Sequence, residues 1–145
     1  MKVISRLLNI DAKNANDRVY SDRAIDTMCG RVLPVLKLKK KFDENFNDLS
    51  KIGTVLGVAS ARREGNDLVI TAEVRRFPKN CSLNIAGVII EGEYSEGQES
   101  VAEFELKFFN ISDSSSYVNK IEVYSRAGKL VRQHVVYKNE CEYEK

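Results

Sequence analysis

The chain has 145 residues, 43% hydrophobic and 30% charged, which is the composition of a folded domain and excludes a disordered or fibrous protein. Its 23 basic and 21 acidic residues leave a net charge of +2, so no long-range attraction draws it toward nucleic acid or a membrane surface. It contains only two prolines, and no repeat or linker divides it. We therefore expect a single domain over residues 1–145.

Regular elements are few in the first third of the chain. Residues 3–10 are compatible with a buried strand and also with the apolar stripe of a helix. Residues 21–30 predict a short helix, because Ser21 can cap its first turn and Gly30 can end it in the left-handed conformation.

Two less regular segments follow this helix. Residues 32–38 are apolar around Pro34, which suits an edge strand or a loop. Residues 39–49 are mostly polar with apolar residues at helical spacing, so they predict a loop that carries one helical turn.

From residue 52 onward, hydrophobic and polar residues alternate with the period of half-buried strands. The predicted strands are Ile52–Ala61, Leu68–Val74, Ser82–Ile90, Ala102–Phe108, Ile121–Ser125 and Leu130–Tyr137. Residues 91–100 and 112–116 predict polar loops, residues 126–129 predict a hairpin turn, and Gly87 is a candidate bulge. With seven or eight short strands and one or two short helices, the chain is mainly β, and we expect a small closed or nearly closed β barrel, or a sandwich.

The sequence offers little for catalysis. His134 is the single histidine, so a metal site based on histidine is not expected. If the chain were a serine protease, Ser82 would be the nucleophile and His134 the base, but neither lies in a recognised motif. No phosphate-binding glycine loop occurs, and the three cysteines are far apart, which predicts reduced thiols. We therefore expect no cofactor and no metal.

Contacts with a protein partner are the alternative to catalysis. Basic clusters interrupted by acidic residues suit an acidic protein surface better than nucleic acid. Aromatic residues are enriched at interfaces, although burial in a packed core is the commoner role for each of those in question. The candidate partner-binding residues are Lys37, Lys39, Lys40, Lys41, Arg62, Arg63, Phe109 and Tyr117, and the exposed-aromatic interpretation also includes Tyr124 and Tyr137.

The order of short motifs between residues 4 and 125 resembles that of the prohead (head maturation) proteases of tailed bacteriophages. The motifs are Asn14–Ser21 before a short helix, Leu33–Leu36, Ile52–Val55, Asp67–Val74, Cys81–Gly87 and Phe104–Ile111. The resemblance implies a β barrel flanked by helices, with Ser82 near the position of the family's nucleophile.

The departures from this family concern its catalytic residues. The family's histidine would follow the segment that matches Leu33–Leu36, where this chain has the lysine-rich residues 37–41. Without a base, the hydroxyl of Ser82 would remain a weak nucleophile. The resemblance therefore implies a protease-like fold without protease activity, reused as a capsid auxiliary (decoration) protein.

We accordingly expect a non-enzymatic virion structural protein that binds the major capsid protein and copies of itself. It would be assembled in the host cytoplasm, because no signal peptide or membrane-spanning segment is expected. An active maturation protease is the first alternative, and a small nucleic-acid-binding barrel is the second.

Overall fold

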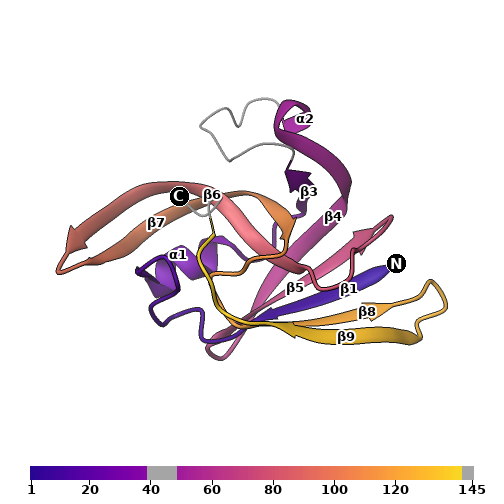
Figure 1. Ribbon diagram of the computed structural model, residues 1–145. Helices are drawn as coiled ribbons and strands as arrows, with labels where there is room; N and C mark the ends of the chain where they lie inside the picture. The colour runs from indigo at the N-terminus through magenta and orange to yellow at the C-terminus, as the bar shows by residue number, and fades with distance from the viewer. Residues whose placement is uncertain (39–48, 142–145) are drawn as a thin grey trace.

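The computed structural model describes residues 1–38 and 49–141, and these form nine strands and two short helices (Figure 1). In chain order they are β1 (Lys2–Leu7), β2 (Arg18–Tyr20), α1 (Asp22–Thr27), β3 (Leu33–Leu38), α2 (Leu49–Ile52), β4 (Gly53–Glu64), β5 (Asp67–Val74), β6 (Ser82–Ser95), β7 (Gln98–Ser112), β8 (Asn119–Tyr124) and β9 (Leu130–Val136).

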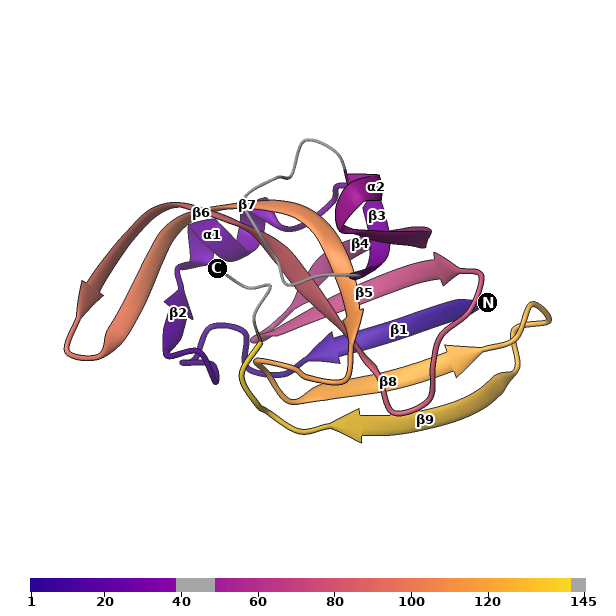
Figure 2. The same cartoon turned by 45° about the horizontal axis from the view of Figure 1, so that its top comes forward.

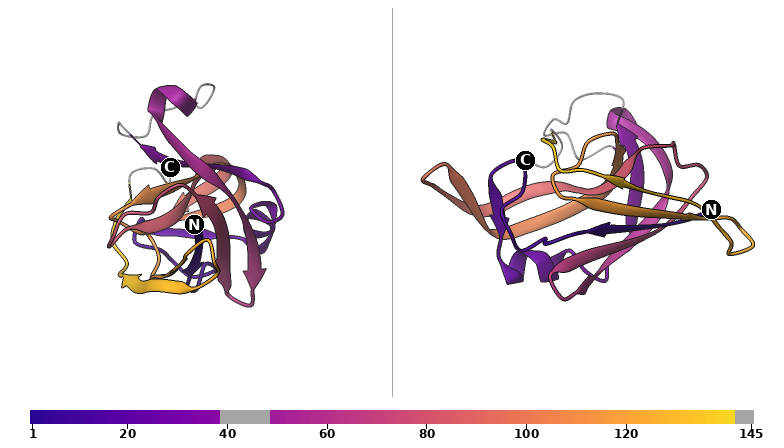
Figure 3. Two further views of the ribbon diagram at one scale, coloured as in Figure 1. Left: turned by 90° about the vertical axis from the view of Figure 1, so that its right-hand side faces the viewer. Right: turned by 60° about the horizontal axis from the view of Figure 1, so that its bottom comes forward.

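All nine strands belong to one sheet, which curls into a nearly closed barrel (Figures 2 and 3). The order of strands is β2-β7-β3-β4-β5-β1-β8-β9, and β6 pairs with β7 outside this path. Pairing is antiparallel except where β7 meets β2 and β3. The mainly β, nearly closed barrel predicted from the sequence is confirmed. The count of strands is higher than expected because Arg18–Tyr20 also pairs with β7.

The ambiguous first segment is a strand at the centre of the sheet. β1 pairs with β5 on one side and with β8 on the other, over all six of its residues. Val3, Ser5 and Leu7 point into the barrel and are fully buried. Antiparallel pairing with β5 and β8 therefore makes this segment a strand, whereas its local periodicity was also compatible with a helix.

The predicted short helix is confirmed as α1. The Ser21 hydroxyl accepts a hydrogen bond from the Ala24 N–H at 3.1 Å, and Gly30 has a φ of +83°. Ala24 and Ile25 are buried against the sheet, and the Thr27 hydroxyl donates to the carbonyl of Phe104 at 3.1 Å. The helix thus packs on β7.

Strand β3 is only partly the edge strand that the proline suggested. It pairs with β4 along its length, but it meets β7 only at Val35 and Leu36. Pro34 precedes this contact, where the strand has one neighbour, and a proline is tolerated at such an edge position.

The barrel core is formed by inward-facing residues of the strands together with α1. Tyr20 and Phe104 pack edge to face with ring centroids 5.3 Å apart. The largest members of the core include Leu7, Ile10, Tyr20, Ile25, Met28, Leu56, Leu68, Ile70, Phe109 and Tyr117.

Side chains close the barrel where backbone pairing does not. The Ser5 hydroxyl and the Asn119 amide both donate to the Leu83 carbonyl, at 2.8 Å and 3.0 Å. These bonds tie the start of β6 to β1 and β8, strands with which it shares no backbone ladder among the described residues. Buried polar groups that are satisfied in this way specify one arrangement of the strands.

The prediction of a loop over residues 91–100 is wrong. Strands β6 and β7 continue as a hairpin through Ser95 and Gln98, with register shifts after Ala86, Ile89 and Glu91. The hairpin projects away from the barrel (Figures 1 and 2). Its polar composition reflects exposure of both faces of this ribbon and not the absence of strands. The register shift expected at Gly87 is present between Ala86 and Gly87, but the extra residue is Lys107 on the partner strand β7.

Candidate binding surfaces

Ser82 lies in a buried network of polar groups at the start of β6. Its hydroxyl lies 2.9 Å from the Ser112 carbonyl and 2.5 Å from the Ser114 carbonyl, and it accepts a hydrogen bond from the Asn84 amide at 2.5 Å. The Ser115 hydroxyl in turn donates to the Asn84 side-chain oxygen at 2.8 Å. Because Ser82 is 0% exposed, a substrate carbonyl has no access to its hydroxyl.

His134 has a different partner. Its Nε2 lies 2.7 Å from the backbone carbonyl of Cys81, and the neighbouring Arg132 guanidinium donates to the Phe77 carbonyl. Both side chains hold β9 to the segment that leads into β6. Within the described residues, no hydrogen bond joins His134 to Ser82. The geometry therefore does not assemble these two residues as a nucleophile and its base.

The basic candidate residues are dispersed. Lys37 is exposed on β3, and Lys39, Lys40 and Lys41 lie outside the described residues. Arg62 and Arg63 are close in sequence, but they project to opposite faces of β4 and are already paired.

Both arginines of β4 form ion pairs with carboxylates of the same chain. Arg62 contacts Glu64 at 2.7 Å, and Arg63 contacts Asp22 and Asp26 of α1 at 2.8 Å and 3.4 Å. The hydrogen bonds that Arg63 donates to the carboxylates of Asp22 and Asp26 raise the pKa of Arg63 above its usual value. Charges neutralised by near neighbours have little attraction left for a partner.

The aromatic candidates Phe109 and Tyr117 are core residues, 0% and 2% exposed. The expectation that they form an exposed contact surface is therefore corrected, and the packed-core alternative holds for both. Phe108 and Phe109 are consecutive on β7 and belong to two different hydrophobic clusters, so both faces of the strand are covered there and alternation alone could not show that Phe109 is buried. Tyr137, by contrast, is 76% exposed, just after β9.

The projecting hairpin is the most distinctive surface of the molecule. We call residues 90–99 the acidic arm, because it carries Glu91, Glu93, Glu96 and Glu99 and no basic residue. Every residue from 90 to 97 is exposed, including Tyr94 at 74%. Glu99, which is opposite Tyr94 near the turn of the hairpin, accepts a hydrogen bond from Arg18 at 2.6 Å. The other three carboxylates have no ion pair within the described part of the chain.

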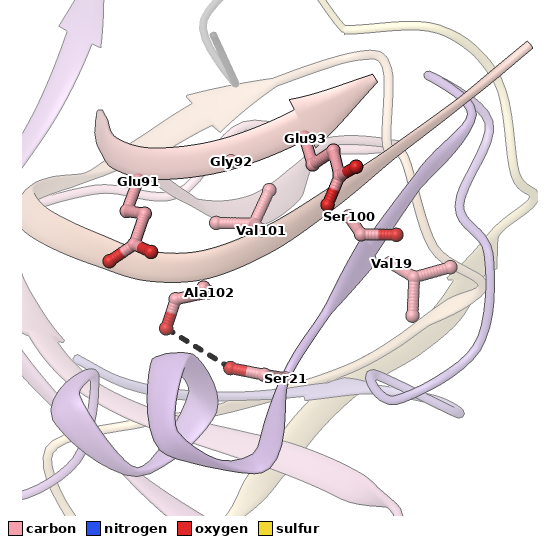
Figure 4. Close-up of a pocket in the computed structure, with 8 residues that line it drawn as sticks. All are labelled: Val19, Ser21, Glu91, Gly92, Glu93, Ser100, Val101 and Ala102. Atoms are coloured by element: carbon pink, nitrogen blue, oxygen red, sulfur yellow. Dashed lines mark hydrogen bonds between the residues drawn. The ribbon is translucent and has the colours of Figure 1, made fainter. Parts of the chain in front are cut away.

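A shallow pocket lies beneath the arm, between it and the segment that leads into α1 (Figure 4). Val19 and Val101 provide its apolar lining, and the carboxylates of Glu91 and Glu93 come from the arm above. The Ser21 hydroxyl at its lower border is occupied, since it donates to the Ala102 carbonyl at 3.2 Å. The pocket can accommodate a positively charged side chain, but it offers no pair of groups for nucleophilic catalysis.

The opposite end of the barrel is basic. We call Lys2, Arg75, Arg76, Arg126 and Lys129 the basic end, and all five are exposed. Pairing in the sheet gathers them: Lys2 is opposite both Glu73 and Tyr124, and Tyr124 is opposite Leu130. Figures 1 to 3 place this end and the arm tip on opposite sides of the molecule.

Strand β9 borders the basic end and has an open edge. It is the last strand of the sheet path and pairs only with β8 among the described strands. Leu130, Val131 and Val135 are 42%, 55% and 40% exposed. An edge strand with exposed apolar residues and no charged residue pointing outward is a site for pairing with another chain.

Comparisons of the chain with models of protein families, with curated proteins and with solved structures find no match in any of the three. Within the described residues, no group of three or more histidine, cysteine or acidic side chains is arranged to hold a metal ion. The described helices include none long and apolar enough to cross a membrane.

Proposed function

We propose that the protein acts by binding other proteins during assembly and not by catalysis. The observation that carries this proposal is the acidic arm, an ordered ribbon of β6 and β7 that has no core of its own and is bordered only by the short strand β2 from Glu99 onward, among the described residues. An isolated hairpin is marginally stable in water, so a chain gains little from extending one into solvent unless a partner covers it. Exposed unpaired carboxylates together with Tyr94 give the arm the character of an interaction surface.

The specific role that we propose is that of a capsid auxiliary protein of a tailed bacteriophage. This part rests on the motif order described above and on the burial of Ser82, which leaves a protease-like sequence without an accessible nucleophile. A small β domain that presents a projecting arm suits attachment to a repetitive protein shell. The major capsid protein is the partner that this role implies.

The experiment is a measurement of copy number and intact mass of this chain in purified mature particles of the phage that encodes it. Hundreds of uncut copies per particle are expected for a shell component. Absence from mature particles, or presence only as cleaved fragments in immature ones, would overturn the structural role and favour the maturation protease.

A further inference from the structure

Within the described residues, the two ends of the molecule carry exposed charges of opposite sign that have no ion-pair partner. On the body of the barrel, many basic side chains form ion pairs with carboxylates, such as Arg6 with Glu64 at 3.0 Å and Lys107 with Glu105 at 2.7 Å. At the ends, neither the arm carboxylates Glu91, Glu93 and Glu96 nor the cations Lys2, Arg126 and Lys129 have an ion-pair partner within the described residues. The net charge of +2 therefore does not reveal that acidic side chains gather at one end and basic side chains at the other.

One copy cannot neutralise its own ends. The arm tip points away from the barrel on the side opposite to the N-terminus and the β8–β9 turn (Figures 1 and 3). Two copies arranged head to tail can do so, because the acidic arm of one then meets the basic end of the next. Glu73 and Glu122 also lie near that end, but the exposed cations outnumber them.

The two ends also offer compatible backbone edges. Among the described strands, β6 of the arm pairs only with β7, and at the other end β9 pairs only with β8. Exposed apolar side chains lie beside both edges, with Ile90 and Tyr94 on the arm and Val131 on β9. Strand addition between two open edges satisfies backbone groups on both sides, and opposite charges across the contact select the partner and the orientation.

We infer that the acidic arm of one copy docks against the basic end of a second copy, along the open edge of β9. This inference deepens the proposed assembly function by naming a partner and a surface. The contact is heterologous, since the two surfaces differ, so repetition generates a ring or a filament and not a two-fold dimer.

The test is sedimentation velocity of the purified chain at two salt concentrations. At about 50 mM salt the chain is expected to self-associate with increasing concentration, and at about 1 M salt, where the screening length falls to about 3 Å, it is expected to be monomeric. An arm variant, Glu91→Lys with Glu93→Lys, and an end variant, Arg126→Glu with Lys129→Glu, should each weaken association by at least about tenfold.

Rescue distinguishes this mode of contact from a general loss of folding. An equimolar mixture of the two variants, and the single chain that carries all four substitutions, should both regain association, because opposite charges face each other again. The control is Lys13→Glu with Arg23→Glu. It changes net charge as the end variant does, at two exposed residues in weak pairs of 3.8 Å and 3.9 Å, and should associate like the unaltered chain.

Several outcomes would overturn the inference. The chain could be monomeric at every concentration at low salt, or both charge variants could associate normally. If association is unchanged in the arm variant and in the end variant but is lost in Val131→Lys, two copies pair through their β9 strands around a two-fold axis instead. Low-salt binding of DNA that the end variant abolishes, without self-association, would assign the basic end to nucleic acid. A monomeric chain present at high copy number in particles would reject this contact and retain the proposed function.

Discussion

Ser82 illustrates how a residue that resembles a nucleophile in sequence serves the fold instead. Its hydroxyl connects the Asn84 side chain to the carbonyls of residues 112 and 114, at the point where β7 ends and the chain turns toward β8. Ser82 and Asn84 are 0% and 1% exposed, and a buried polar group without a partner is costly. The network therefore holds β6 and the 112–116 segment together.

Ser82→Ala is expected to lower the free energy of unfolding by about 1–3 kcal/mol, because it removes the donor to the carbonyls of Ser112 and Ser114 and the acceptor of the Asn84 amide. Ser60→Ala is the matched control: Ser60 is half-buried on β4, and its replacement should change stability by less than about 0.5 kcal/mol. Urea denaturation measures both. Equal stability of the two variants would show that the network contributes nothing.

Glu64 is expected to give a specific acid sensitivity. Hydrogen bonds from Arg6 and Arg62 lower its pKa below the usual 4.5. A lowered native pKa stabilises the fold above the unfolded-state pKa, and this contribution is lost as the pH falls through the native value. Glu64→Gln should therefore flatten the fall in stability below about pH 4.5, and the effect is modest because the pair is exposed.

The measurement for Glu64 is urea denaturation at a series of pH values, from neutral to about pH 3. Glu73→Gln serves as the control, because Glu73 is exposed at the end of β5 and no ion pair holds it within the described residues. An identical pH profile for the Glu64 variant and the unaltered chain would contradict the prediction.

At the scale of elements, the hairpin of β6 and β7 forms part of the barrel core with its inner half and the acidic arm with its outer half. Its inner part, from Ser82 to Gly87, is buried across the barrel, and its outer part from residue 90 is fully exposed. Register shifts between these parts bend and twist the ribbon, which is the ordinary effect of β-bulges. The bulges therefore allow a core element to leave the barrel as an arm.

Gly87→Ala is expected to disturb this bend. A Cβ at position 87 would lie 2.1 Å from the Glu105 carbonyl oxygen, which is backbone and cannot easily move. We expect a loss of about 1–3 kcal/mol in the free energy of unfolding.

Gly92→Ala provides the matched control on the same strand. There the nearest atom to an added Cβ is the flexible end of Ile89, at 3.1 Å, so the substitution should cost less than about 1 kcal/mol. Thermal or urea denaturation compares the two variants. A Gly92 variant less stable than the Gly87 variant would contradict this account of the bend.

For the whole molecule, the arrangement is a barrel with an acidic projection at one end and exposed cations at the other. The body is rigid because β1 has a strand on either side and side chains seal the remaining gap. The arm consists of β6 and the start of β7, and within the described residues the only further strand beside it is β2, which pairs with β7 from Glu99 onward. Stability should therefore be distributed unevenly between the body and the arm.

Hydrogen exchange at single-residue resolution should reveal this distribution. In the monomer at high salt, amides of residues 91–98 are expected to exchange at least about 100-fold faster than those of β1 and β5, because opening of the arm exposes no core. Equal protection of the arm and the central strands would contradict this expectation.

The local elements could be predicted because short-range chemistry determines them. Alternation of apolar and polar residues located β5 and the final hairpin of β8 and β9, and Ser21 with Gly30 bounded α1 correctly. Local signals were insufficient where pairing with distant segments decides the conformation. The short strand β2 and the polar arm both form because β7 lies beside them.

The surroundings of the candidate residues could be determined only from the tertiary structure, because they too depend on pairing between distant segments. The sequence by itself determined a mainly β domain, its balance of charge and a scarcity of catalytic groups. Only the packed structure decided that Ser82 is buried in a polar network, that Phe109 and Tyr117 face the core, and that the acidic arm and the basic end lie on opposite sides of the molecule. Burial and charge separation depend on which strands become neighbours, and pairing across more than a hundred residues of chain, as between β1 and β8, leaves no local signal in the sequence.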